Sequence, residues 1–252
     1  FHTYLWDESI SVAVWATKCS LFTIHRTFSS CYANHSTLTT GTQVCAFCHT
    51  PHGSNVDAVL QNSAPLWNQD LPTTASYGVY TSITFDASDA AAITNTTYSA
   101  SLLCMSCHDG TVYIDSFGNR AGTTLIGNGG GNLGTDLRDD HPISIEYAGG
   151  ACTNVNADCD PATATAVGAD RDFNAIQYAQ INTTNQWWID VATWDSTGDG
   201  TRDQTGVADT REKSDIILYA RTFTGGNGQS VECDSCHDPH EDTARPVSFL
   251  RI

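Results

Sequence analysis

The chain has few basic residues, one methionine and no long hydrophobic run. It contains 11 Lys and Arg against 28 Asp and Glu, which gives a formal net charge of -17. This balance argues against nucleic acid and anionic membrane surfaces as partners, because both attract basic proteins. The best apolar run, residues 10–16, ends before Lys18 and is shorter than the roughly 18 apolar residues of a membrane-spanning helix. We therefore predict no nucleic-acid partner and no membrane span.

Cysteine, in contrast, is abundant, and six of the ten cysteines lie in three C-x-x-C-H motifs. The motifs read Cys45-Ala46-Phe47-Cys48-His49, Cys104-Met105-Ser106-Cys107-His108 and Cys233-Asp234-Ser235-Cys236-His237. This pattern attaches c-type haem: the two thiols bond to the two vinyl groups of the porphyrin, and the adjacent histidine becomes the proximal iron ligand. We predict three covalently attached haem c groups, with His49, His108 and His237 as proximal ligands.

Two other functions of a C-x-x-C pair are less consistent with these motifs. A thioredoxin-like redox pair does not need a histidine after the second cysteine each time. A zinc site usually needs a second C-x-x-C at closer spacing than this chain offers.

The second axial ligand of each iron must come from elsewhere in the chain. The single methionine, Met105, lies inside a motif spacer and points along the edge of its own haem, so it cannot cap an iron. Histidine is the other common distal ligand. The histidines outside the motifs are His2, His25, His35, His52, His141 and His240.

Three of these histidines have sequence neighbours that favour a role as distal iron ligand. His52 and His240 each lie three residues beyond a proximal histidine, with a proline between. They cannot reach the opposite face of their own haem, so we predict that each reaches a neighbouring haem. His141 lies in an Asp-Asp-His-Pro turn whose acidic side chains could accept its second ring N–H. We predict all three as distal ligands, and an ordinary surface histidine is the alternative for any one of them.

Four cysteines lie outside the motifs, an even number that predicts two disulfides in an exported protein. Pairing between neighbours in sequence would join Cys19 to Cys31 and Cys152 to Cys159. Four cysteines allow three connectivities, so the other two remain open.

The segment between Asp195 and Asp203 resembles the start of a calcium-binding loop. It has oxygen-bearing side chains at loop positions 1, 3, 5 and 9 and glycine at position 6, but position 12 is Gly206 instead of glutamate. These residues favour a plain acidic turn, and calcium binding is the alternative.

The pattern of residues predicts little regular secondary structure. Polar residues and glycine recur almost throughout and apolar runs are brief, so we predict mostly irregular coil with few short helices and strands. Residues 9–16 alternate as a strand would, Ile216 to Phe223 form a second candidate strand, and residues 127–134 predict a loop. We expect one domain over residues 1–252, with a haem-free insertion at about 120–230. Ordering this much coil costs about 1–2 kcal/mol per residue, which large buried haems would offset.

The order of the motifs resembles that of the outer-surface multihaem c-type cytochromes of metal-reducing bacteria, some of which polymerise into extracellular filaments, or nanowires. The likeness spans about residues 25–251, and residues 150–230 contribute little. It is carried by CHTPHG at 48–53, DHPIS at 140–144, CHDPH at 236–240 and Phe249-Leu250-Arg251. The resemblance implies a mostly coiled fold wrapped around a stack of bis-histidine haems that continues between subunits. In such filaments a histidine of one subunit can cap a haem of the next.

The resemblance also implies a further ligand candidate, and the sequence differs from its four-haem relatives in one respect. The early histidine of the family matches His25 best, twenty residues before Cys45. Four-haem relatives tend to carry another C-x-x-C-H shortly after the Phe-Leu-Arg stretch, whereas this sequence ends at Ile252. His25, His52, His141 and His240 therefore face three irons, so one of them is idle or serves a neighbouring subunit.

These observations predict an electron-transfer protein and not an enzyme, because bis-histidine irons leave no open coordination site. We expect the subunit of an extracellular conductive filament, with redox proteins or extracellular acceptors as partners. The alternatives are a soluble periplasmic electron shuttle and a multihaem reductase, which would need a five-coordinate haem and usually a basic funnel for its anionic substrate. The first residue, Phe1, and the cysteine usage predict a secreted protein, extracellular or at the cell surface, matured in the periplasm or its equivalent.

Overall fold

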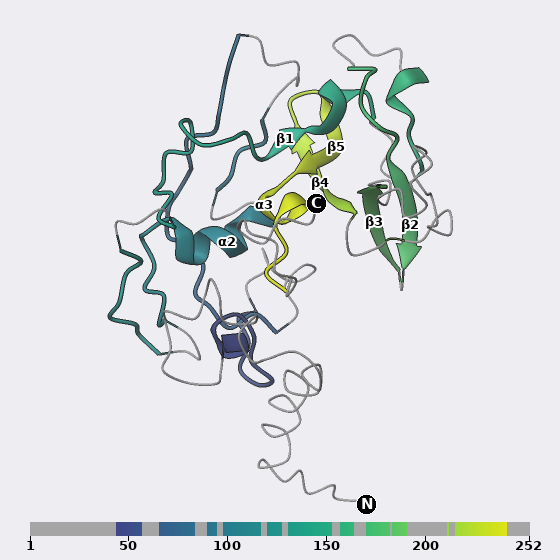
Figure 1. Cartoon of the computed structure of the whole chain (residues 1–252). Coiled ribbons are helices and arrows are strands. Elements are labelled where there is room, and N and C mark those ends of the chain that lie inside the picture. Colours follow the sequence, from purple (N-terminus) through teal and green to yellow (C-terminus); the bar gives the residue numbers. More distant parts are fainter. Residues whose placement is uncertain are drawn as a thin grey trace, which may run out of the picture.

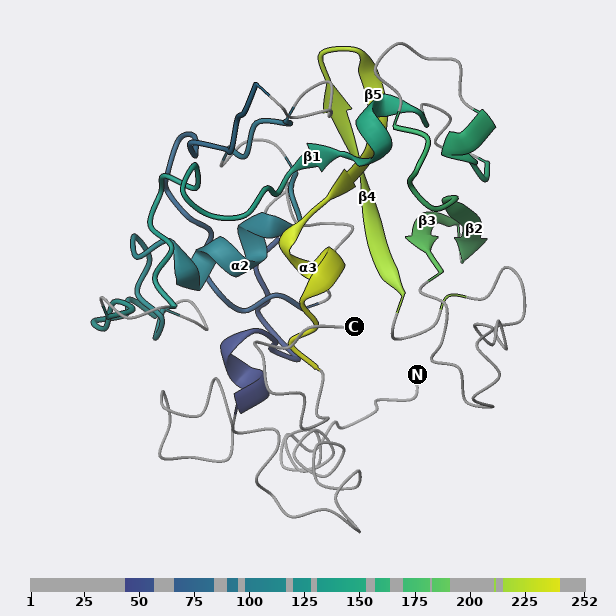
Figure 2. The same cartoon turned by 45° about the horizontal axis from the view of Figure 1, so that its top comes forward.

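The computed structural model describes residues 44–56, 66–83, 90–94, 98–116, 120–127, 131–152, 157–163, 170–181, 183–190, 211 and 215–240. Two helices of this part, α2 (Ser101–His108) and α3 (Cys233–Cys236), lie side by side in both views (Figures 1 and 2). Three short 3-10 turns are η2 (Val44–Phe47), η3 (Tyr147–Gly150) and η4 (Pro161–Thr163). The strands are β1 (Ile145–Glu146), β2 (Gln177–Ile181), β3 (Thr184–Ile189), β4 (Ile216–Phe223) and β5 (Gly226–Val231).

The five strands form one antiparallel sheet in the order β1-β5-β4-β3-β2. Two hairpins supply most of it. Phe223 pairs with Gly226 and Ile181 pairs with Thr184, so both hairpins have two-residue turns. Such turns need backbone with positive φ, and Thr183 adopts φ 69°. The β4–β5 hairpin leads directly into α3, so the sheet carries the third C-x-x-C-H motif.

This sheet shows that the prediction of mostly irregular coil wrapped around a stack of haems is wrong. The predicted strand over Ile216–Phe223 is confirmed as β4. Strands β1, β2, β3 and β5 were not predicted, because β1 has only two residues and polar residues and glycine obscure the pattern of the other three. β5 reads Gly-Asn-Gly-Gln-Ser-Val and buries three consecutive residues, since a strand inside a sheet can be covered on both faces. The other two predicted segments have different outcomes. The candidate strand at residues 9–16 lies outside the described residues. In the predicted loop at 127–134, the described residues 127 and 131–134 form no helix or strand.

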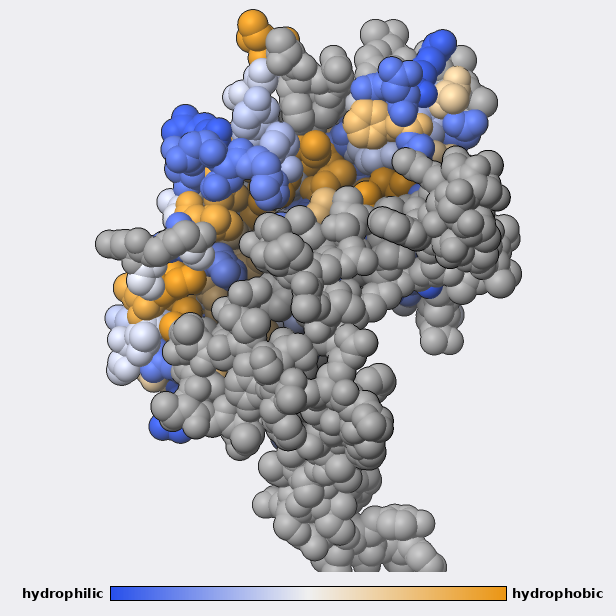
Figure 3. All heavy atoms as spheres, viewed as in Figure 1, coloured by the Kyte–Doolittle hydropathy of each residue, from blue (hydrophilic) through white to orange (hydrophobic). Residues whose placement is uncertain are grey.

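Two hydrophobic clusters form the core of the described residues. The first packs Trp187 of β3 and Leu218 of β4 against Tyr147 and Ile176 beside the sheet. The second surrounds α2, whose Leu102 and Met105 are fully buried with partners from several loops, namely Tyr77, Ile93, Leu137 and Ile143. The surface of the described part mixes hydrophobic and hydrophilic residues (Figure 3), and no described helix is long and apolar enough to cross a membrane.

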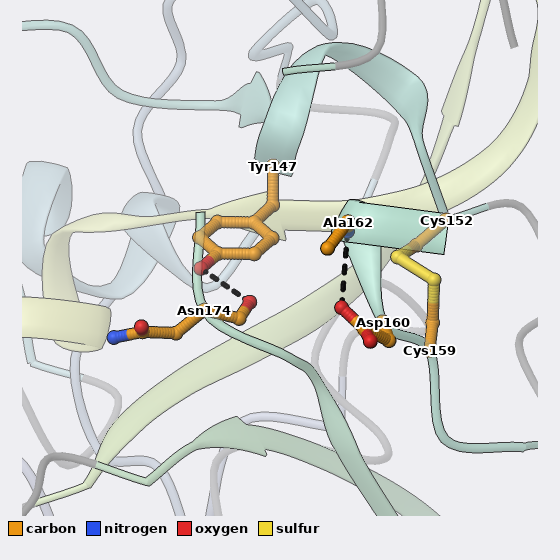
Figure 4. Close-up of a disulfide and its surroundings, with 6 residues drawn as sticks. All are labelled: Tyr147, Cys152, Cys159, Asp160, Ala162 and Asn174. Carbon is orange, nitrogen blue, oxygen red and sulfur yellow. Dashed lines mark hydrogen bonds between the residues drawn. A yellow bond between two sulfur atoms is a disulfide. The ribbon is translucent and has the colours of Figure 1, made fainter. Parts of the chain in front are cut away.

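Cys152 and Cys159 form a disulfide (Figure 4), with Cys152 buried in the first cluster and Cys159 packed against it. It has the local pairing that the sequence predicts. Beside it, the Tyr147 hydroxyl donates a hydrogen bond to the Asn174 carbonyl at 2.9 Å. The other predicted disulfide, Cys19 with Cys31, and the calcium-like segment between Asp195 and Asp203 lie outside the described residues.

Candidate haem-binding site

Each C-x-x-C-H motif forms one helical turn. In the first motif the His49 N–H donates to the Cys45 carbonyl at 2.8 Å, and in the third the His237 N–H donates to the Cys233 carbonyl at 3.0 Å. The second motif occupies the last residues of α2. Residues three apart share a helix face, so each turn directs its two thiols to one side and leaves the histidine at its end. The six motif cysteines are half-buried as whole residues, and none is in a disulfide.

The three motifs approach one another through their cysteines. The Cys104 thiol makes a hydrogen bond with the Cys233 thiol, which together with burial raises its pKa well above the usual value. Burial raises the pKa of Cys48, and burial followed by the nearby Cys48 raises the pKa of Cys107 to about 12. A redox-active dithiol has a lowered pKa, since the thiolate is the reactive form. The environment of these thiols is therefore unlike that of a thioredoxin-type pair.

Two motif histidines face histidines from other parts of the chain. The ring centroids of His49 and His240 are 6.0 Å apart and their planes differ by 17°. Those of His237 and His141 are 6.2 Å apart with planes differing by 18°. In both pairs a predicted proximal ligand lies opposite a predicted distal ligand. His240 follows the third motif in sequence but faces the histidine of the first motif.

The separation of these rings fits one metal ion between two imidazoles. A metal–nitrogen bond of about 2 Å on each side, plus about 1.1 Å from nitrogen to ring centre, gives a centroid separation of about 6 Å. Offset aromatic pairs can have similar separations. Both pairs, however, join the histidine of a C-x-x-C-H motif to a histidine outside that motif. The two ring pairs therefore have the separation expected of two histidine ligands on one haem iron, at the first and third motifs.

Several backbone and side-chain oxygens orient these rings. His108 Nδ1 lies 2.6 Å from the Gly131 carbonyl, which can only accept, so this nitrogen carries the proton and Nε2 is left for a metal. His240 Nδ1 lies 3.4 Å from Asp238 Oδ1. His141 Nδ1 is 3.5 Å from the Pro142 carbonyl, whereas the sequence suggested an acidic partner. Such second partners fix which nitrogen binds the metal.

For the other two predicted distal ligands, His52 and His25, the structure gives no facing motif histidine among the described residues. His52 is exposed, and its described hydrogen bonds are those of its backbone with Thr50. His25 lies outside the described residues. Both histidines therefore stay predictions as distal ligands, for this chain or for a neighbouring subunit.

A second segment supports the first motif, and no sequence pattern indicated this contact. The Asn68 N–H donates to the Cys48 carbonyl at 2.9 Å, and the Thr50 N–H donates to the Leu66 carbonyl at 2.9 Å. Between them Trp67 meets the His49 ring edge-on, with centroids 6.3 Å apart. Trp67 Nε1 is buried and has no hydrogen-bond partner in the described part of the chain. An acceptor such as a haem propionate would satisfy this donor.

No protein-family model matches the chain, and no curated protein matches it significantly. Among the described residues, no three His, Cys, Asp or Glu side chains converge as a metal site made of protein ligands would require. A haem iron needs only two protein ligands, because the porphyrin supplies the other four. Two facing histidines would therefore supply all the protein ligands that one haem iron needs.

Proposed function

We propose that this protein binds three haems covalently and transfers electrons through them. Each cysteine S–H would add across one vinyl double bond of the porphyrin, forming one C–S and one C–H bond with nothing released. His49, His108 and His237 would bind the irons from the motif side. When bound, each haem would supply an iron that takes up and gives back one electron.

The observation that carries this proposal is the pair of facing histidines at two motifs, His49 with His240 and His237 with His141. With an imidazole on each side, an iron has no position left for a substrate. Such a centre can change oxidation state but cannot bind and activate a small molecule. This supports electron transfer over a multihaem reductase, which would need one five-coordinate haem.

The proposed location is outside the cytoplasm, at the cell surface or beyond it. The Cys152–Cys159 disulfide supports an oxidising compartment, where such bonds persist. By its resemblance to filament-forming cytochromes, we propose that the chain assembles into an extracellular filament, with redox proteins or extracellular acceptors as partners. A net charge of -17 would favour cations or subunit contacts that neutralise the surface. A soluble periplasmic shuttle is the alternative.

Haem attachment is tested by counting haems in variants that remove one motif. The variant Cys104→Ala/Cys107→Ala should retain two of three covalent haems, measured by intact mass and by the pyridine haemochrome spectrum. The matched control Cys152→Ala/Cys159→Ala removes two cysteines outside the motifs and should retain three. A wild-type chain without covalent haem would refute the proposal.

Assembly and coordination need separate measurements on the native protein. Electron microscopy of the material should show filaments, whereas discrete monomers would leave the soluble shuttle. Electron paramagnetic resonance of the oxidised protein should show only low-spin iron. A high-spin component would support the reductase instead.

A further inference from the structure

A buried carboxylate joins the helices that carry the second and third motifs. Glu232 immediately precedes Cys233 and caps α3, while Ser101 is the first residue of α2 and lies three residues before Cys104. The Ser101 hydroxyl donates to Glu232 Oε2 and accepts from the Cys233 N–H at 3.1 Å. One hydroxyl therefore connects the start of α2 to both the side chain and the backbone at the start of α3.

Glu232 is held in place from several sides. Its Oε1 accepts from Arg221 Nη1 at 2.8 Å and from the Ser230 hydroxyl at 3.0 Å, and its Oε2 accepts from the Ser99 hydroxyl at 2.9 Å. Arg221 also donates to the Ala92 carbonyl at 2.8 Å. The Arg221 and Glu232 side chains are 2% and 0% exposed. A buried ion pair with its hydrogen bonds filled resists displacement, because losing one partner leaves a charge uncompensated.

The same region brings together the first cysteines of the two motifs. The Cys104 and Cys233 thiols are in hydrogen-bond contact, and α2 packs against α3. A covalently attached haem follows the helical turn that holds its two cysteines. The position of α2 relative to α3 therefore determines how the haems at these motifs lie relative to each other.

We propose that Ser101 and Glu232 are positioning residues that fix the spacing and relative orientation of the haems attached at the second and third motifs. This inference rests on the proposed function. Electron exchange between two haems depends on their separation and mutual orientation, so the hydrogen bonds across α2 and α3 control exchange between this pair. The Arg221–Glu232 ion pair anchors them to β4.

The test compares Ser101→Ala with Ser230→Ala in the full chain with its haems attached. Both variants remove one fully buried hydroxyl bonded to Glu232, but only Ser101 connects the two helices. We expect Ser101→Ala to lose amplitude in the Soret circular-dichroism couplet, which reports the geometry between haems, and to shift at least one reduction potential. Ser230→Ala should retain both. Unfolding midpoints measured on the same samples separate a general loss of stability from a change in haem geometry.

The outcomes separate this inference from the proposal on which it rests. Three bound haems with an unchanged couplet and unchanged potentials in Ser101→Ala would overturn the inference and leave the proposed function intact. An equal effect in Ser230→Ala would also overturn it, because the effect would then come from the carboxylate and not from the link between helices. Absence of covalent haem from the wild-type chain would refute the proposed function instead. If Ser101→Ala does not fold, Ser99→Ala removes the hydrogen bond that joins the segment leading into α2 to Glu232, and unlike Ser230→Ala it should shift the same signals.

Discussion

The imidazole rings of His49 and His240 lie 6.0 Å apart with nearly parallel planes, although His49 ends the first motif and His240 lies three residues beyond the third. The same relationship recurs between His237 and His141 at 6.2 Å. The histidine after the third motif thus faces the first motif, and the third motif faces the Asp-Asp-His-Pro turn. This arrangement would link haems into a connected set, because neighbouring residues of one segment would bind different irons.

These pairs predict the effect of removing each distal ligand. His240→Ala and His141→Ala should each convert one haem from low spin to high spin, and the double variant should convert two. The measurement is electron paramagnetic resonance with the optical spectrum of the oxidised protein. His52→Ala is the informative comparison, since its ring is placed opposite no motif histidine in the described residues. If His240→Ala left all irons low-spin, His240 would not be an iron ligand, and its position beside His49 would need another explanation.

How far the site can be predicted from sequence depends on the range of its interactions. The cysteines and proximal histidines are recognised because their chemistry is contained in five consecutive residues. The proline between His237 and His240 indicates that the second ring must turn away, but its target depends on which distant segments fold together. Glu232 could not be recognised, because one acidic residue among 28 carries no sign of burial.

The fold was less predictable than the motifs. Strand β4 has branched and aromatic residues and is recognisable, whereas its partner β5 has two glycines and no aromatic residue. β5 is stabilised by its neighbours on both sides, since it pairs with β1 and β4. Stabilisation of this kind comes from tertiary context and not from intrinsic strand propensity.

The two described arginine–carboxylate pairs should differ in their contribution to stability. Arg221→Met leaves the buried Glu232 without its cation and should lower the free energy of unfolding by about 3–5 kcal/mol. The matched control is Arg138→Met, which breaks the exposed pair with Asp136 and should leave the midpoint unchanged within error. Denaturant unfolding measures both. Equal midpoints for the two variants would contradict the burial of the first pair.

Two glycines near the second motif should respond differently to alanine. Gly110 has φ +73°, and an added Cβ would lie 2.9 Å from Asn132 Oδ1, so Gly110→Ala should lower the free energy of unfolding by about 1–2 kcal/mol. At Gly131 the nearest atom to an added Cβ is Ile126 Cδ1 at 3.5 Å, an ordinary contact. Gly131→Ala should therefore have little effect, and it still supplies the carbonyl to His108. Denaturant unfolding of both variants is the measurement, and similar losses would argue against the backbone conformation at Gly110.

Stability should fall at alkaline pH partly through Tyr147. Burial raises the pKa of this phenol from 10.0 to about 12. Between these values the unfolded chain loses the proton and the folded chain keeps it, so the unfolded state binds fewer protons and stability decreases as pH rises. Tyr147→Phe removes this contribution and should show a shallower decline in unfolding free energy between pH 10 and 12. Identical slopes for the variant and the wild type would mean that the phenol ionises equally in both states.

The Cys152–Cys159 disulfide should stabilise the fold without affecting haem attachment. It closes a short loop, with a sequence separation of 7, and chain-entropy arguments give about 2.5 kcal/mol for a loop of this length. Cys152 is also buried in the cluster beside the sheet, so the cross-link restrains the segment that packs against β3 and β4. Cys152→Ala/Cys159→Ala should therefore lower the unfolding midpoint while the haem count and the low-spin spectrum stay as in the wild type. A loss of haem in this variant would mean that the sheet and the motifs fold as one dependent unit, because Cys152 and Cys159 lie outside all three motifs.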